Sequence, residues 1–173
     1  MSLLNSAHEP QLVTAQGEIV ANDWVLLSDD DAIPAEGFAV LGFERALREL
    51  DGLNGRYGVR VVPGEDVRRL QPYLSKIALV EVAFPGYRDG RGYSTARILR
   101  QDLGFAGEIR AVGDVLRDQL FYMLRCGFDA FLVKDADPTG AIAHARGLYD
   151  LAYQSAADSL KPVWKLRQEA AGA

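Results

Sequence analysis

Strand and helix patterns alternate along most of this chain, and the alternation limits the folds that it can adopt. Residues 77–84, IALVEVAF, form a nearly unbroken apolar run, as expected of a strand that is covered on both faces. Shorter runs at residues 59–62, 109–112 and 130–133 also predict strands, and helical spacing separates each run from the next. Short connections in succession favour parallel strands with right-handed crossovers. The sequence therefore predicts an α/β protein.

We predict a single α/β domain with a mostly parallel sheet of about five strands and helices on both faces, as in flavodoxin-like, doubly wound folds. A half-barrel-like array of βα units is the alternative architecture. The chain has 173 residues, enough for one hydrophobic core. We divide it into an N-terminal arm or hairpin at residues 1–22, the α/β domain at 23–160 and a C-terminal tail at 161–173.

Helix limits are predicted from capping residues and breakers. Ser94 is a candidate N-cap, Asp114 caps the following helix, and Gly127 closes that helix. Pro72 breaks or ends an earlier helix, and Asp137 precedes the last long one. The expected helices cover residues 43–53, 63–71, 94–103 and 137–157, with one more between Asp114 and Gly127.

Cysteine and histidine content excludes several kinds of site. Cys126 is the only cysteine, which excludes an internal disulfide, a CxxC redox pair, a cysteine-based zinc site and a self-contained iron–sulfur cluster. It lies beside a helix end and is interpreted as a structural thiol. The two histidines are far apart in sequence. We therefore expect no metal and no cofactor.

The distribution of charge and the hydropathy of the chain limit the kinds of partner that it can bind. The first 66 residues contain 12 acids and 4 bases, and the remainder contains 12 acids and 15 bases. The overall acidity argues against nonspecific nucleic-acid binding, although a local positive face could meet an acidic protein or a small anion. No apolar run approaches the ~20 residues that span a bilayer, and the N-terminus lacks a hydrophobic signal core. We expect a cytoplasmic protein that does not bind membranes.

The most informative segment is the loop at residues 86–94, which follows the long apolar strand. It contains three glycines together with several charged and aromatic residues. Glycines let the backbone approach a ligand, arginines bind oxyanions, and strand-end loops are where α/β proteins place ligands. We predict that this loop binds a small oxyanion or a protein partner; the alternative is a loop closed by its own Arg–Asp pairs. The candidate residues are Arg88, Asp89, Arg91, Gly92, Tyr93, Ser94, Arg97, Asp114 and Lys134.

Weaker patterns suggest other chemistry. Residues 90–95, GRGYST, resemble a truncated dinucleotide fingerprint, but five residues separate the motif from its strand, so incidental glycines are the better interpretation. Glu81 and Lys134 partly match the phosphoacceptor position and lysine of receiver domains, which we attribute to shared α/β architecture. Asp114 and Asp118 share a helix face and could form an acid–base pair. Three acids at residues 29–31 are interpreted as a solvated turn, with a divalent cation site as the minority alternative.

The chain resembles a proteobacterial family that is labelled as an oxidoreductase involved in sulfite reduction and is encoded beside the sulfite reductase hemoprotein. The resemblance rests on FPGYRDGRGYSTARILR (84–100), GEIRAVGDVLRDQLFYMLRCGFDAF (107–131) and WVLLSDDD (24–31). It implies a role in sulfur assimilation and transfers no catalytic residues. The sequence has no siroheme or cluster ligands and no convincing flavin or nicotinamide motif.

Three functional hypotheses follow. The first is an accessory protein of assimilatory sulfite reduction, which docks on or supports sulfite reductase and uses the 86–94 loop to contact the partner or an oxyanion. The second is a stand-alone enzyme that holds an anionic or phosphorylated small molecule with the same loop. The third is a structural subunit whose arginines at residues 88–97 stabilise a homodimer.

Overall fold

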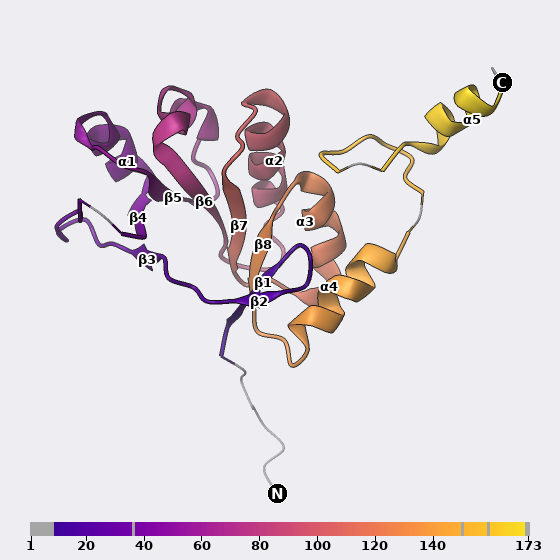
Figure 1. The fold of residues 1–173 in the computed structure, drawn as a ribbon, viewed down its shortest axis with the longest axis horizontal. Helices are drawn as coiled ribbons and strands as arrows, with labels where there is room; N and C mark the ends of the chain where they lie inside the picture. The colour runs from indigo at the N-terminus through magenta and orange to yellow at the C-terminus, as the bar shows by residue number, and fades with distance from the viewer. Residues whose placement is uncertain (1–8, 36, 150, 159, 172–173) are drawn as a thin grey trace, which may run out of the picture.

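The computed structural model describes residues 9–35, 37–149, 151–158 and 160–171, which form an α/β fold around one sheet (Figure 1). The strand order in this eight-stranded sheet is β2-β1-β8-β7-β6-β5-β4-β3. Strands β3 to β8 run parallel, whereas β1 pairs antiparallel with both β2 and β8. The strands are β1 (Gln11–Thr14), β2 (Ile19–Val20), β3 (Val25–Leu26), β4 (Ala39–Gly42), β5 (Tyr57–Val61), β6 (Ile77–Phe84), β7 (Glu108–Gly113) and β8 (Ala130–Val133).

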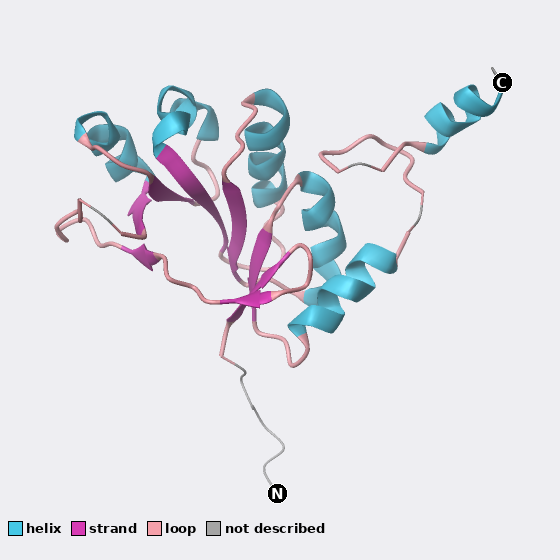
Figure 2. Cartoon of the chain, in the orientation of Figure 1, coloured by secondary structure: helices cyan, strands magenta, loops and turns pink. Residues whose placement is uncertain are grey.

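Helical segments connect the successive parallel strands from β4 to β8, whereas a loop connects β3 to β4 (Figure 2). The α-helices are α1 (Phe43–Glu49), α2 (Arg91–Arg97), α3 (Leu120–Cys126), α4 (Pro138–Gly147) and α5 (Val163–Ala171). Three segments are 3₁₀ helices, η1 (Leu50–Gly52), η2 (Val67–Lys76) and η4 (Arg117–Gln119), and η3 (Ile98–Asp102) is a π-helical turn that extends α2. No helix among the described residues combines the length and apolarity needed to cross a membrane.

The sheet is curled, and helices α1 to α4 lie along its convex side (Figure 1). Strands β4 to β8 are neighbours in sequence order, without the reversal of direction that a doubly wound sheet contains. Right-handed crossovers between successive neighbours all place their helices on the same face. Figure 1 shows α1, α2, α3 and α4 on that face. The α/β class is confirmed, but the predicted doubly wound arrangement is wrong: the half-barrel-like alternative describes the fold, and the sheet has eight strands instead of five.

The hydrophobic core lies between the sheet and these helices. On β6, Val80, Val82 and Phe84 point toward the helices and are at most 2% exposed. Because strand side chains alternate, the intervening Glu81 lies on the concave face. Each fully buried apolar side chain contributes about 1.5–3 kcal/mol relative to exposure.

The segment between β2 and β3 lies across the concave face. Asn22 accepts a hydrogen bond at its Oδ1 from Nη1 of Arg110 on β7, at 2.7 Å. A Cβ atom on Gly58 of β5 would lie 3.1 Å from Cε3 of Trp24, so the indole packs directly on the backbone of β5. This segment therefore covers part of the concave face. The first eight residues of the predicted arm lie outside the described residues.

Two strands and two helix limits agree with the predictions. Strands β6 and β8 have the predicted limits, and Gly127 closes α3 with a φ of 94°. Asp137 caps α4 as predicted, accepting a hydrogen bond from Gly140 N at 2.9 Å. However, α4 ends at Gly147 rather than near residue 157, and the predicted polar tail contains helix α5.

Three further predicted helix limits are also wrong. Ser94 lies inside α2, which begins at Arg91, and is not its N-cap. Pro72 lies within the 3₁₀ helix η2 and does not end it. Asp114 does not cap a helix, because its carboxylate is bound elsewhere, as described below. The contacts that Asp114 makes instead are with residues distant in the chain.

Candidate functional site

The 86–94 loop follows the carboxyl end of β6 and is tied to the connection after β7. The backbone N–H of Tyr87 donates a hydrogen bond to Oδ2 of Asp114 at 3.0 Å. The side-chain amide of Gln119 donates to the Tyr87 carbonyl at 3.0 Å, and Asp89 N donates to the Gly86 carbonyl at 2.9 Å. Asp114, predicted to cap a helix, therefore holds this loop in place. Sequence reasoning missed Gln119 and Tyr87 as parts of the site.

Asp89 and Arg91 form the ion pair that the alternative interpretation of the loop expects. Arg91 donates to Asp89 Oδ1 from Nε at 2.9 Å and to Oδ2 from Nη2 at 2.7 Å. The hydrogen bond from Arg91 lowers the pKa of Asp89 below its usual range, and the same contact raises the pKa of Arg91. The Arg91 side chain remains 65% exposed. The pair therefore orders the loop without sealing it.

Arg88 lies against Tyr87 on the outer side of the loop. Its Nε donates to the Tyr87 hydroxyl at 2.7 Å, and its guanidinium carbon lies 5.3 Å from the ring centroid. Tyr87 is 53% exposed, and Arg88 is also exposed. The two side chains present an aromatic and cationic surface to solvent.

The other predicted site residues divide into packing and surface positions. Gly92 is buried against the ring of Phe84, where a Cβ would lie 2.5 Å from Cζ, and Tyr93 packs edge-on against the same ring at 5.5 Å. Burial raises the pKa of the Tyr93 phenol. Ser94 and Arg97 are on α2, and Arg97 Nε donates to Gln101 Oε1 at 2.7 Å.

Lys134 lies after β8 and shares a hollow with Asp114. This hollow has a volume of about 380 Å³, at the carboxyl ends of β7 and β8. It is lined by Pro10, Gly113, Asp114, Val115, Leu116, Leu132 and Lys134. The structure thus places Arg88, Asp89, Arg91 and Asp114 on or against one loop, with Lys134 at the neighbouring strand end.

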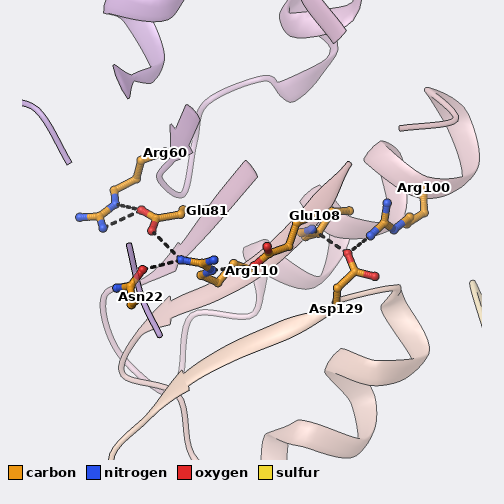
Figure 3. A network of polar contacts seen from close by, with 8 residues as sticks. Asn22, Arg60, Glu81, Arg100, Glu108, Arg110 and Asp129 are labelled. Atoms are coloured by element: carbon orange, nitrogen blue, oxygen red, sulfur yellow. Dashed lines mark hydrogen bonds and ion pairs between the residues drawn. The ribbon is translucent and has the colours of Figure 1, made fainter. Parts of the chain in front are cut away.

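A second polar cluster, which sequence reasoning missed as a unit, lies on the concave face (Figure 3). Glu81, only 3% exposed, accepts a hydrogen bond from Nε of Arg60 at 2.8 Å. Arg110, also 3% exposed, lies 4.0 Å from the same carboxylate and bonds Glu108 at 2.7 Å. The sheet register aligns Arg60, Glu81 and Arg110 on three adjacent strands. The sequence signal for this cluster was a charged residue inside each of three mostly apolar strands.

This buried row is a structural cluster rather than a phosphoacceptor site. Glu81, which partly matched the receiver pattern, has its carboxylate occupied by two arginines in the middle of β6. Elsewhere, Arg100 pairs with Asp129 and donates to the carbonyls of Phe105, Gly107 and Gly127. Burial raises the pKa of Asp129 despite this pairing. Both groups of contacts join strands and loops that are distant in sequence.

The remaining candidates show no assembled chemistry. Cys126 is half-buried, and burial raises the pKa of its thiol, as expected of a structural cysteine. The Ser28 side chain and backbone hydrogen-bond to Asp31 and lower its pKa, so the acids at residues 29–31 form a turn. Across residues 9–35, 37–149, 151–158 and 160–171, no group of three His, Cys, Asp or Glu side chains is placed to hold a metal ion.

Comparison with known proteins places the chain in a family. A family model described as a bacterial protein of unknown function (DUF934) matches residues 58–164, more than half of the chain. The chain belongs to this family. The DUF934 match runs from β5 into α5 and contains the 86–94 loop, Asp114, Lys134 and the buried row on β5, β6 and β7.

Comparisons beyond the DUF934 family add little. No curated protein matches the chain. Among solved structures, the chain is similar to inosine 5′-monophosphate dehydrogenase from Legionella pneumophila, with a TM-score of 0.48 and 17% sequence identity. The alignment covers 74% of this chain and 44% of that protein. Likeness at this level is too low to support an inference about function.

Proposed function

We propose that this protein is an accessory of assimilatory sulfite reduction and docks on sulfite reductase through the 86–94 loop. The pathway is suggested by the sequence resemblance at residues 84–100 and 107–131. Docking is suggested by the geometry of the loop. The observation that carries it is the exposed stack of Tyr87 and Arg88 on a loop that hydrogen bonds hold in one conformation.

The loop has the features of a protein contact surface. Tyrosine and arginine are enriched among the residues that dominate binding energy at protein interfaces. A loop that is already ordered also loses little conformational entropy when it binds. Arg88 and Arg91 project into solvent and line none of the hollows described in this structure. This favours a partner surface over an enclosed anion pocket.

Charge indicates what the partner must offer. Arg91 is already paired with Asp89, whereas no carboxylate among the described residues lies within 4 Å of the Arg88 side chain. A matching surface on the reductase would therefore place a carboxylate against Arg88 and an apolar patch against the Tyr87 ring. Charge-assisted hydrogen bonds to arginine are among the stronger polar contacts.

Alanine substitution at Arg88 is expected to weaken binding to the sulfite reductase hemoprotein at least about tenfold, the effect of losing a central interface contact. The dissociation constant would be measured by biolayer interferometry with the purified hemoprotein. Arg69→Ala is the matched control, since Arg69 is also exposed and also lies over an aromatic ring, that of Phe43, at 5.5 Å. Wild-type affinity for Arg88→Ala, or equal loss for both variants, would contradict docking through the loop.

We expect the midpoint of thermal unfolding of the protein to stay unchanged when sulfite, sulfate or phosphate is added at millimolar concentration. Both loop arginines are open to water, and one is already paired, so an inorganic anion gains little there. A ligand that binds only the folded state raises the midpoint by mass action. A rise that disappears in Arg88→Ala would instead support the stand-alone enzyme that holds an anion with this loop.

A further inference from the structure

A hollow of about 650 Å³ lies at the carboxyl ends of β7 and β8, between η4 and α4. Its volume is in the range of ~300–1,000 Å³ typical of small-molecule sites. The strand-end position is where open α/β sheets bind ligands. It is lined by Val115, Leu116, Arg117, Asp118, Leu120, Val133, Lys134, Asp135, His144 and Leu148.

The walls of this hollow are largely apolar. Val115, Leu120 and Val133 are buried beneath it. Leu116 and Leu148 remain 39% and 41% exposed, although both side chains line the hollow. An apolar group that entered would remove these leucines from water, at roughly 25 cal/mol for each Å² buried. The hollow therefore suits a ligand with an apolar body.

The charged groups around the hollow differ in how they are engaged. Arg117 Nη1 lies 3.7 Å from Asp135 Oδ1, which also accepts a hydrogen bond from Asp137 N at 2.8 Å. Within the described part of the chain, no carboxylate lies within 4 Å of the Lys134 ammonium. Lys134 also lines the adjoining 380 Å³ hollow and so lies where the two meet. Its charge is available to a ligand in either hollow.

Asp118 and His144 complete the set of polar groups. Asp118 on η4 contributes a carboxylate to the lining of the hollow. His144 on α4 offers a further ring nitrogen at the wall of the hollow. Lys134 and His144 together can receive an anionic group.

We propose that this hollow binds an amphipathic organic anion, a carboxylate or sulfonate with an apolar body. The anionic group lies at Lys134 with His144 near it, and the apolar body lies against Leu116, Leu120 and Leu148. This site is separate from the docking loop and does not depend on it. Inorganic sulfite or sulfate lacks the apolar part and does not fill the hollow.

The probe for this test is 8-anilinonaphthalene-1-sulfonate, whose fluorescence rises in apolar surroundings, titrated into the full chain. Lys134→Ala is expected to weaken its binding about tenfold, as a lost charge-assisted contact predicts. Asp118→Asn is expected to tighten binding, because it removes a negative charge from the lining. Lys165→Ala on α5 is the matched control and should bind as the wild type does. Octanoate should displace the probe, and sulfate should not.

The neutral analogue N-phenyl-1-naphthylamine separates charge recognition from general apolar binding. Its affinity should be the same for the wild type and for Lys134→Ala. Equal losses for both probes, equal losses in Lys134→Ala and Lys165→Ala, or no fluorescence rise at millimolar probe would each overturn the proposal. Circular dichroism and thermal midpoints of the variants would show that the exposed substitutions leave the fold intact.

Discussion

Glu81→Gln is expected to lower the free energy of unfolding by about 3 kcal/mol, because it removes the shared carboxylate from a buried charge row. The substituted amide would keep the shape of the side chain but leave Arg110, 3% exposed, with less negative charge nearby. Arg60 is about a third exposed and can turn toward water, which limits the loss. The change would be measured by urea denaturation at neutral pH, where an unchanged slope shows that stability itself was altered.

An exposed ion pair supplies the comparison for Glu81. Glu44 pairs with Arg69 at 2.6 Å, with both side chains more than half exposed. Glu44→Gln should therefore cost less than ~1 kcal/mol, as surface pairs typically do. A Glu81→Gln variant within about 0.5 kcal/mol of the wild type, a margin typical of surface substitutions, would show that the row contributes little.

Replacing all three charged residues of the row separates the effect of ion pairing on stability from the cost of burying the charges. Simultaneous substitution of Arg60 and Arg110 by methionine and of Glu81 by leucine removes all three charges while keeping similar volumes. Buried ion pairs replaced in this way are often neutral or more stable, because desolvation of the charges no longer opposes folding. This variant should be more stable than Glu81→Gln. The opposite order would mean that contacts of Arg110 with Asn22 and Glu108 matter more than charge balance.

Gly113→Ala is expected to destabilise the fold on the order of 3 kcal/mol and to disturb the 86–94 loop, since strain and overlap add at this position. Gly113 has a φ of 100°, a conformation that costs a residue with a side chain roughly 1–2 kcal/mol. A Cβ there would also overlap the carbonyl oxygen of Phe84 and lie 3.1 Å from its carbonyl carbon, and backbone cannot move aside as a flexible side chain can. The thermal midpoint and urea unfolding would measure the loss.

Gly113→Ala is also expected to affect the 86–94 loop, because the next residue, Asp114, holds that loop in place. Asp114 N donates to the Phe84 carbonyl at 2.7 Å, and its carboxylate holds Tyr87. Displacing the end of β7 should therefore release the loop and weaken reductase binding in the surviving folded protein. Gly86→Ala is the control within the loop, since no atom lies within 4 Å of its added Cβ. If Gly86→Ala and Gly113→Ala weakened reductase binding equally, the close approach of β6 and β7 at Gly113 would be excluded as the cause of the loss.

Local pattern predicted several elements well. Strands β6 and β8 could be predicted from local sequence alone, because each is a continuous apolar run with breakers within a few residues of its ends. The same holds for the glycine that closes α3 and for Asp137 at the start of α4. The placement of the 86–94 loop after β6 follows directly from the strand limit. Whether its arginines bind a partner remains a prediction.

Other features depended on residues far apart in the chain. The side chain of Asp114 has the chemistry of a helix cap, yet it binds Tyr87 27 positions earlier, where sequence spacing offers no guide. Ser94 does not cap α2, because the helix already begins at Arg91. The lack of a side chain at Gly92 lets this first turn pack directly on the ring of Phe84. The hollow at Lys134 is assembled from η4, the end of β8 and α4.

By itself, the sequence determined the α/β class, the position of the central strands and the arginine-bearing loop, because hydrophobic period and turn chemistry act over short stretches. Only the tertiary structure decided that the helices lie on one face and that the sheet curls, since this depends on the order in which strands pair. It also decided the neighbours of each charge: Arg60, Glu81 and Arg110 meet because sheet register aligns three strands. Register is set by packing across the whole sheet, so no local stretch of sequence contains it.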